Sequence, residues 1–306
     1  METVMTRLTA LILAVFASLL PSGAWAQLKV VATTADLASL AQDIGREHAR
    51  VTALALHTQD PHFVDARPHL ALELAKADLL LAVGLDLEIG WLGTLQTGSR
   101  NGKIQSGARG YLECSAFVRV LEIPKGKVDR SRGDVHPTGN PHYMFDPRQA
   151  ARVAKGIAER MAELDPENAA AYKKNAIALI KQLGAANRAW QKQLAPARGA
   201  KVIAYHKSFP YLADWLGLTV VEHVEPKPGI PPNPHHVAHV MATARRHDVR
   251  VILQESFYPS KVAQVIAEKT GTHLVRIPAA PNFRGGQSYI AHMGAIVSEI
   301  SKAYAR

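Results

Sequence analysis

Short apolar and β-branched runs alternate with longer segments of helical periodicity, and this alternation restricts the fold more than any other feature of the sequence. In the first half it predicts strands at 28–32, 51–55 and 78–83, near Tyr111 and over 118–123, and helices at 35–44 and 71–76. Strand–helix–strand units at this spacing favour parallel sheets with helices packed on their faces. The predicted fold class is therefore α/β.

The same alternation restarts after residue 200. The predicted strands lie at 201–205, 219–224, 250–254 and 273–277, and the predicted helices at 209–216, 234–247, 259–269 and 288–304. We therefore expect two α/β lobes, each a mostly parallel sheet flanked by helices.

A long helical segment separates the two halves. Asp165 followed by Pro166 is typical of a helix start, and the apolar stripe behind it continues to about Leu194. About thirty helical residues would measure about 45 Å and form a rigid connector between the lobes. Two shorter helices broken at Gly184 are the alternative, because an interior glycine destabilises a helix. The connector predicts a division into lobes and helix at 27–164, 165–196 and 197–306.

The first 26 residues have the pattern of a secretory signal peptide. Arg7 precedes the apolar run 8–20, and the small residues Ala24 and Ala26 form a cleavage motif before Gln27. An uncleaved membrane anchor is the alternative, but the apolar run is shorter than the roughly 20 residues that a span requires. No cysteine lies near the junction, so we expect no lipid anchor. The mature chain is predicted to be exported to a periplasm.

Charge and cysteine content exclude two function classes. The formal net charge is +10, but the basic residues are spread along the chain without a run or interleaved aromatic residues, so we expect no nucleic-acid partner. Cys114 is the only cysteine. It cannot form an internal disulfide or a Cys-rich zinc finger, and we expect it to be buried and inert.

Three of the 14 histidines occupy settings that suit a metal ligand. His62 and His142 each follow a proline, which fixes its own φ, and His206 follows the predicted strand 201–205. Imidazoles held at loop tips and strand ends can converge on one ion, and zinc is well served by three of them. A lone histidine is more often a surface or core residue, so the prediction depends on the similar settings.

Five motifs together resemble the periplasmic zinc- and manganese-binding proteins of ABC importers. They cover essentially the whole mature chain, in the same order as in that family. In chain order the motifs are Gln59-Asp60-Pro61-His62-Phe63, Ala75-Lys76-Ala77-Asp78-Leu79-Leu80 before Gly84, Pro141-His142-Tyr143-Met144-Phe145-Asp146-Pro147, His206 with Phe209-Pro210-Tyr211-Leu212, and Glu225-Pro226 with Gly229-Ile230-Pro231-Pro232.

The resemblance implies two α/β lobes joined by a long rigid helix, with a metal ion bound in the cleft between them. It implies that His62, His142 and His206 are metal ligands, and that the partner is an ABC permease with its cytoplasmic ATPase. Manganese-type members usually carry a carboxylate at the position of His206. Imidazole there favours Zn2+ over Mn2+ as the cargo, because carboxylate-rich sites suit manganese better. We expect a monomer.

The sequence departs from the family pattern at the fourth ligand. Members commonly supply an aspartate after the last strand, where this chain has Pro278-Ala279-Ala280-Pro281. A water could complete the site, or Glu255 at the end of the strand 250–254 could replace the aspartate, because strand ends in such sheets face the cleft. Glu255 could instead orient an imidazole from behind. Asp60 is a weaker candidate and is expected to stabilise its own turn.

Two further segments contain histidines. The loop before His142 carries only Asp134-Val135-His136 where zinc-type members often have a histidine- and acid-rich insert, so we expect weak metal scavenging by it. His235 and His239 lie four residues apart at a predicted helix start, and could hold zinc if a third ligand arrived. The alternative is a hydrated helix end.

The same residues also allow two other functions. Three histidines near Glu255 could describe a zinc hydrolase with Glu255 as general base, but no His-Glu-x-x-His motif or oxyanion-stabilising loop is present. A binding protein for another cargo or an adhesin is a second alternative, which no repeat or wall anchor supports. We therefore expect no enzymatic activity.

Overall fold

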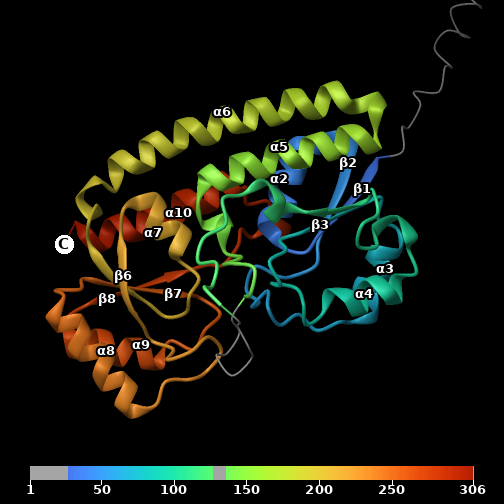
Figure 1. Ribbon diagram of the computed structural model, residues 1–306. Coiled ribbons are helices and arrows are strands. Elements are labelled where there is room, and N and C mark those ends of the chain that lie inside the picture. The colour runs from blue at the N-terminus through green and yellow to red at the C-terminus, as the bar shows by residue number, and fades with distance from the viewer. Residues whose placement is uncertain (1–26, 127–135, 306) are drawn as a thin grey trace, which may run out of the picture.

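A computed structural model describes residues 27–126 and 136–305 (Figure 1). The predicted signal peptide at 1–26, and Asp134 and Val135 of the loop before His142, lie outside the described residues. Within the described residues, no helix is long and apolar enough to cross a membrane.

The first sheet contains four parallel strands in the order β2-β1-β3-β4. Their bounds are β1 (Leu28–Ala32), β2 (Ala49–Ala53), β3 (Leu79–Ala82) and β4 (Tyr111–Glu113). Every residue of β3 is buried, as expected for a central strand that has helices on both faces.

Alternate residues of this sheet pack against different helices. The buried residues Val30 and Leu81 share a core with α2 (Ala35–Gly45) and α5 (Pro147–Leu164). Val31 and Leu80 point the other way, toward α3 (Pro68–Ala75) and α4 (Leu92–Ser99). This is the two-residue period of a strand buried on both faces.

The second sheet repeats the topology of the first, again with four parallel strands, in the order β6-β5-β7-β8. Its strands are β5 (Lys201–Ala204), β6 (Thr219–His223), β7 (Val251–Glu255) and β8 (His273–Ile277). One face packs on α7 (Pro210–Leu216) and α10 (Tyr289–Tyr304), and the other on α8 (Pro234–Arg246) and α9 (Lys261–Thr270). The predicted fold of two parallel sheets flanked by helices is confirmed.

One long helix, α6 (Ala169–Gln193), runs along α5 and α2 and reaches over α10 (Figure 1). It continues through Gly184, so the prediction of one helix is confirmed and the alternative of two helices broken at Gly184 is wrong. Its start was predicted three residues early, because Pro166–Asn168 form a 3-10 turn. The Asp165 carboxylate does not cap that turn; it accepts hydrogen bonds from the Tyr172 hydroxyl at 2.5 Å and from the Asn168 amide. The 25 helical residues measure about 37 Å.

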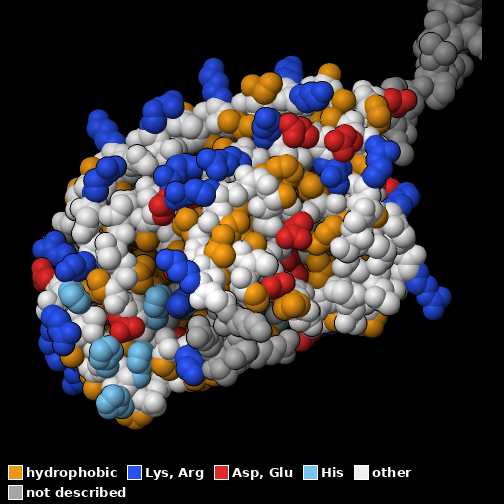
Figure 2. Space-filling view, in the orientation of Figure 1, with side chains coloured by type: hydrophobic (Ala, Val, Ile, Leu, Met, Phe, Trp, Pro, Cys, Tyr) orange, Lys and Arg blue, Asp and Glu red, His pale blue; other side chains and the backbone are white. Residues whose placement is uncertain are grey.

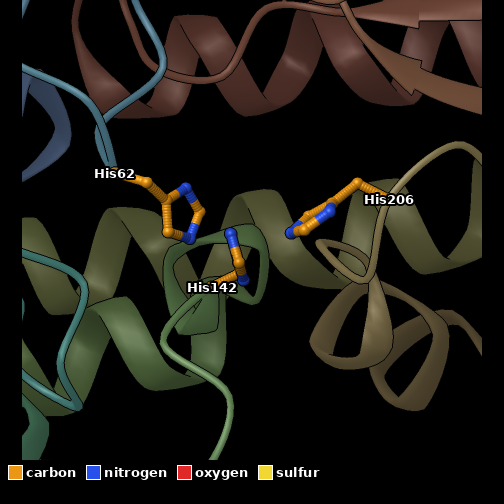
Figure 3. A group of neighbouring side chains, drawn as sticks. All are labelled: His62, His142 and His206. Atoms are coloured by element: carbon orange, nitrogen blue, oxygen red, sulfur yellow. The ribbon is translucent and has the colours of Figure 1, made fainter. Parts of the chain in front are cut away.

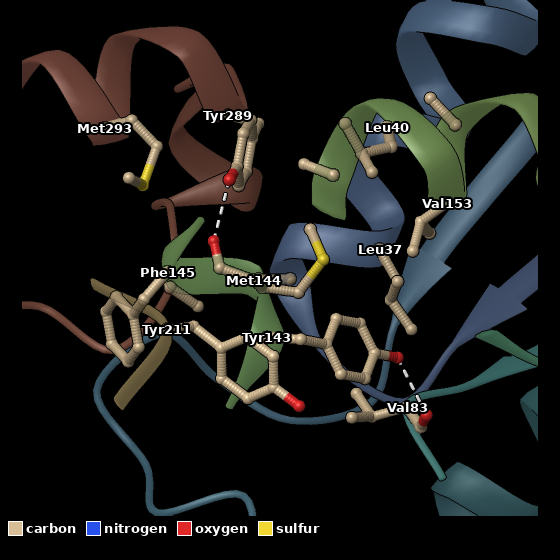
Figure 4. Close-up of a cluster of buried hydrophobic side chains, with 14 of the residues drawn as sticks. Leu37, Leu40, Val83, Tyr143, Met144, Phe145, Val153, Tyr211, Tyr289 and Met293 are labelled. Carbon is tan, nitrogen blue, oxygen red and sulfur yellow. Dashed lines mark hydrogen bonds between the residues drawn. The ribbon is translucent and has the colours of Figure 1, made fainter. Parts of the chain in front are cut away.

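A single apolar core joins the two lobes. Residues from both sheets, and from α2, α5, α6, α7 and α10, belong to one continuous buried cluster. Two tyrosines fix it with hydrogen bonds of 2.7 Å: Tyr143 donates to the carbonyl of Val83, and Tyr289, at the start of α10, donates to that of Met144 (Figure 4). The two lobes therefore share one core on the side of the sheets that faces α6. The division of the chain at residues 164 and 196 stays a prediction.

The segment 118–123 is not a strand, which corrects the prediction. Its backbone groups bond to side chains and a loop: the N–H of Arg119 donates to Gln149, that of Leu121 donates to the Tyr211 hydroxyl, and the Leu121 carbonyl accepts from the N–H of Asn140. These partners replace a neighbouring strand. Helix α4 was not predicted at all, because its sequence LGTLQTGS has little helical periodicity.

Cys114 lies directly after β4, in the core of the first lobe, with no exposed surface. Burial, and then the nearby Glu88 and Glu113 carboxylates, raise the pKa of its thiol far above the usual value. The expectation of a buried, inert cysteine agrees with this environment.

Candidate metal site

Three imidazole rings meet between the lobes. His62 comes from the loop after β2, His142 from the segment before α5, and His206 from the residues just after β5 (Figure 3). One ligand atom from each lies within 4.8 Å of the other two, and the ring centroids are 5.2–5.7 Å apart. Tetrahedral zinc needs its nitrogens about 3.3 Å apart, so a bound ion would draw these rings slightly inward.

The two lobes hold their histidines in different ways. In the first lobe, Asp60-Pro61-His62 and Asn140-Pro141-His142 form the same turn. In each, the oxygen of the first side chain accepts the backbone N–H of the histidine at 3.0 Å and its ring Nδ1–H, at 2.7 Å for Asp60 and 3.0 Å for Asn140. The turn therefore orients both rings through purely local contacts.

In the second lobe the orienting group is a distant carboxylate. His206 is 4% exposed, and its Nδ1–H donates to Glu225, which follows β6, at 2.7 Å. In all three rings, Nδ1–H thus donates to an oxygen acceptor, and the lone pair of Nε2 is available to bind an ion. Such a partner behind each imidazole fixes its tautomer and increases its basicity as a ligand.

Asn140 also connects the lobes directly. Its amide nitrogen donates to the carbonyl of Lys207 at 2.7 Å, while its oxygen holds His142. The residue next to His206 is therefore fixed to the turn that carries His142. Tyr211 strengthens the same connection by donating to the carbonyl of Asn140 at 2.8 Å.

The environment of His142 keeps its ring neutral. Burial, followed by the neighbouring rings of His62, His206 and His136, holds the pKa of His142 well below its usual range. Burial alone would raise the pKa of Asp60, but the hydrogen bonds from His62 outweigh it and the pKa is lowered. A neutral His142 ring and an ionised Asp60 carboxylate are the forms that a divalent cation requires.

His136, which was not predicted as a ligand, lies against His62 at the edge of the site and outside the group of three histidines. Its Nε2 lies 3.2 Å from Nε2 of His62, and the two ring centroids are 5.3 Å apart. Burial, and then the nearby rings of His62 and His206, lower the pKa of His136 to about 4. Its one sequence signal is the following Pro137, which gives it a proline neighbour like that of His62 and His142.

Glu255 lies outside the group of three histidines. Glu255 is the last residue of β7, and it lines a cavity of about 40 Å3 together with His142 and Asp36. Oε2 has no hydrogen-bond partner among the described residues, and burial raises the pKa of Glu255 well above its usual value. The prediction that Glu255 is a ligand stays a prediction.

On its other side the site opens into a larger pocket. This pocket has a volume of about 390 Å3 and is lined by His62 and His206 with their carboxylate partners Asp60 and Glu225, and by Tyr258. Its volume is large enough to hold a hydrated ion.

One member of the predicted accessory pair, His239, has partners in the structure. His239 bonds through Nε2 to Glu222 at 2.9 Å, and its ring stacks on His236 at 6.1 Å. Figure 2 shows a group of histidine side chains on this surface of the second lobe. The described residues contain no further cluster of three potential ligands, so metal binding by His235 and His239 stays a prediction.

The sequence profile of the family described as "Zinc-uptake complex component A periplasmic" matches residues 30–303. The chain belongs to this family. The zinc-uptake family consists of substrate-binding proteins of metal ABC importers rather than enzymes, which confirms the resemblance. Metal capture for import is therefore the function of this chain.

Individual relatives are distant and differ in cargo. The iron-binding protein YfeA of Yersinia pestis is 23% identical over 301 residues, covering 93% of this chain and 88% of that protein. The manganese-binding lipoprotein MntA of Bacillus subtilis (strain 168) is 28% identical over 198 residues, covering 63% and 60%. A crystal structure of ZnuA has a TM-score of 0.77 at 22% identity, covering 91% of this chain and 99% of that one.

Proposed function

We propose that this member of the zinc-uptake family captures zinc between its lobes through His62, His142 and His206, and delivers it to an ABC permease driven by a cytoplasmic ATPase. The observation that carries the proposal is the convergence of three imidazoles from both lobes, each with Nδ1 bound to an oxygen acceptor and Nε2 left for the ion. Capture takes place in the periplasm, after removal of residues 1–26, by a monomer.

The donor set favours zinc over manganese. All three converging donors are nitrogens, and the two nearest carboxylates, Asp60 and Glu225, already accept hydrogen bonds from ligand rings. Imidazole suits zinc, copper, nickel and iron, whereas manganese prefers carboxylate oxygens. Metal availability in the periplasm decides among the metals that the nitrogens favour.

Titration of the metal-stripped protein tests the function. Isothermal titration with zinc should give a sub-micromolar dissociation constant, manganese should bind at least about tenfold more weakly, and His206→Ala should lose most zinc affinity. Equal affinity for both metals would contradict the assignment of zinc. Unchanged zinc binding by His206→Ala would contradict the site itself.

The same titration on Glu255→Ala decides the role of the buried carboxylate. A ligand would lose affinity on truncation, whereas a group that only lines the cavity behind His142 would not. The metal-free Glu255→Ala protein should remain folded, because the change removes a buried carboxylate oxygen that has no partner among the described residues.

A further inference from the structure

The geometry points to one further ligand: we propose that His136 binds the captured ion together with His62, His142 and His206, so that the loaded site holds four imidazoles. This rests on the proposed function, because it concerns the same ion. It assigns a coordinating role to a loop that the sequence suggested was a poor scavenger.

The distance between His136 and His62 supports this assignment. Their Nε2 atoms are 3.2 Å apart. Two nitrogens bound to one zinc ion at 2.0–2.1 Å with a tetrahedral angle lie about 3.3 Å apart. This pair therefore already has the separation that a shared ion requires.

The tautomer of His62 gives a second reason. Its Nδ1–H donates to the Asp60 carboxylate, which can only accept, so the neutral ring carries no hydrogen on Nε2. Two bare nitrogens at 3.2 Å would repel each other, so with a neutral His62 ring the hydrogen between them belongs to Nε2 of His136. An ion at that point replaces the hydrogen and satisfies both lone pairs.

The displaced hydrogen has an acceptor on the far side of the His136 ring. A backbone group of Leu85 raises the pKa of the His136 ring slightly, which is the effect of a nearby carbonyl acceptor. Because Nε2 faces His62, the atom that reaches the Leu85 carbonyl is Nδ1. Moving the ring hydrogen from Nε2 to Nδ1 gives His136 the arrangement of the other three rings, and no proton is gained or lost.

The backbone around Leu85 has an unusual left-handed conformation, which determines where the Leu85 carbonyl points. Gly84, Leu85 and Asp86 all have positive φ, of 84°, 53° and 64°. Such a run is costly for side chains other than glycine and persists only where surrounding contacts stabilise it. Here the buried Glu88 carboxylate accepts the N–H groups of Val83 and Gly84, at 2.7 and 3.1 Å.

A fourth imidazole would tighten selectivity. A site of nitrogens alone disfavours manganese, which prefers oxygen donors, and leaves no coordination position for a carboxylate or a water. In this arrangement Glu255 stays behind His142 as a lining residue of the cavity.

X-ray absorption spectroscopy of the zinc-loaded protein tests the proposal, with His136→Gln as the variant. We expect about four imidazoles around zinc in the wild type and three plus one oxygen or amide donor in the variant. His235→Gln, at an exposed histidine on α8, is the matched control and should resemble the wild type.

Competition titrations give an independent readout. His136→Gln should weaken zinc binding about ten- to a hundredfold and leave manganese binding nearly unchanged, so that the zinc-to-manganese affinity ratio falls by the same factor. Three imidazoles in the wild type, or an unchanged ratio in His136→Gln, would overturn this proposal and leave the three-histidine site standing. A wild type that binds no zinc would overturn both proposals.

Discussion

At the level of single residues, the site is built from one short turn used twice. Asp60-Pro61-His62 and Asn140-Pro141-His142 both bend so that the first side chain holds the histidine by its backbone and its ring. The proline restricts the chain, and the short polar side chain closes the turn. Two ligands are therefore oriented by contacts within their own turns.

This turn predicts the effect of two substitutions at one position. Asp60→Ala removes the acceptor from His62 and should weaken zinc binding about ten- to a hundredfold. Asp60→Asn should lose much less, because Asn140 shows that an amide oxygen can hold the ring in the same turn. Chelator-competition titrations of both variants check this, with Asp65→Ala, at an exposed carboxylate paired with Arg67, as the control. Equal losses in Asp60→Ala and Asp60→Asn would show that the charge matters rather than the turn.

Buried histidines also make the protein sensitive to acid. His292 on α10 is 3% exposed, and burial, with a smaller effect of His57, lowers its pKa to about 4. The unfolded pKa is near 6.5, so between pH 6.5 and 4 the unfolded chain binds more protons than the native one. The free energy of unfolding should therefore fall as the pH drops through this window. The share of His292 is on the order of 2 kcal/mol at pH 4.5.

Urea unfolding of the metal-free protein at pH 7.0 and 4.5 measures this effect. His292→Leu should show a smaller loss of stability between the two pH values than the wild type. His235→Leu, at an exposed position, should lose as much as the wild type. A His292→Leu protein with an undiminished loss would show that this ring does not contribute.

The sequence indicated three of the site residues but not their surroundings. His62, His142 and His206 could be selected because each has a local signal, a preceding proline or a strand end. His136 and Glu225 come to the site from other parts of the chain, and only the folded structure shows that they reach His62 and His206. The position of Glu255 behind the histidines depends in the same way on how the lobes pack.

At the level of elements, the sequence predicted best what its own periodicity determines. Helix α6 and the strands of both sheets follow from apolar patterns within each segment, and their ends shift by a few residues where turns and caps decide. The segment 118–123 was predicted to be a strand because it contains apolar and β-branched residues. In the structure its backbone N–H groups donate to the side chains of Gln149 and Tyr211 and not to a neighbouring strand. Long-range partners of this kind leave no trace in a local pattern.

Two glycines in neighbouring helices should respond oppositely to alanine. At Gly184 in α6, a Cβ would meet only the end of Arg188, at 3.8 Å, so Gly184→Ala should stabilise the protein by about 0.5–1 kcal/mol. At Gly156 in α5 it would lie 2.3 Å from the ring of Phe117, and Gly156→Ala should destabilise by about 1–3 kcal/mol. Urea unfolding of the two variants checks both signs. A destabilised Gly184→Ala would mean that α6 needs flexibility at its centre.

At the level of the whole molecule, the shared core limits how far the lobes can separate. Helices α6 and α10 and the tyrosine hydrogen bonds of Figure 4 belong to one buried cluster that includes both sheets. Wide opening would expose this cluster to water, at a cost proportional to the apolar area. Metal release should therefore depend on small shifts of loops and ligands.

Spin labels on the two lobes can measure this rigidity. Cysteines introduced at the exposed Lys76 and Lys269 would carry the labels, because the buried Cys114 should not react. The distance between the labels should change by less than about 2 Å when zinc binds, as in pre-organised binding proteins. A change of many ångströms would instead indicate a hinge, and would require the core between the lobes to break.

The seclusion of Cys114 has a further consequence for a molecule that carries zinc. Thiolates bind copper strongly and oxidise readily. An accessible thiolate would therefore bind the wrong metal and would be oxidised in an oxygenated environment. With its single sulfhydryl enclosed in the first lobe, the protein presents no thiol to its surroundings.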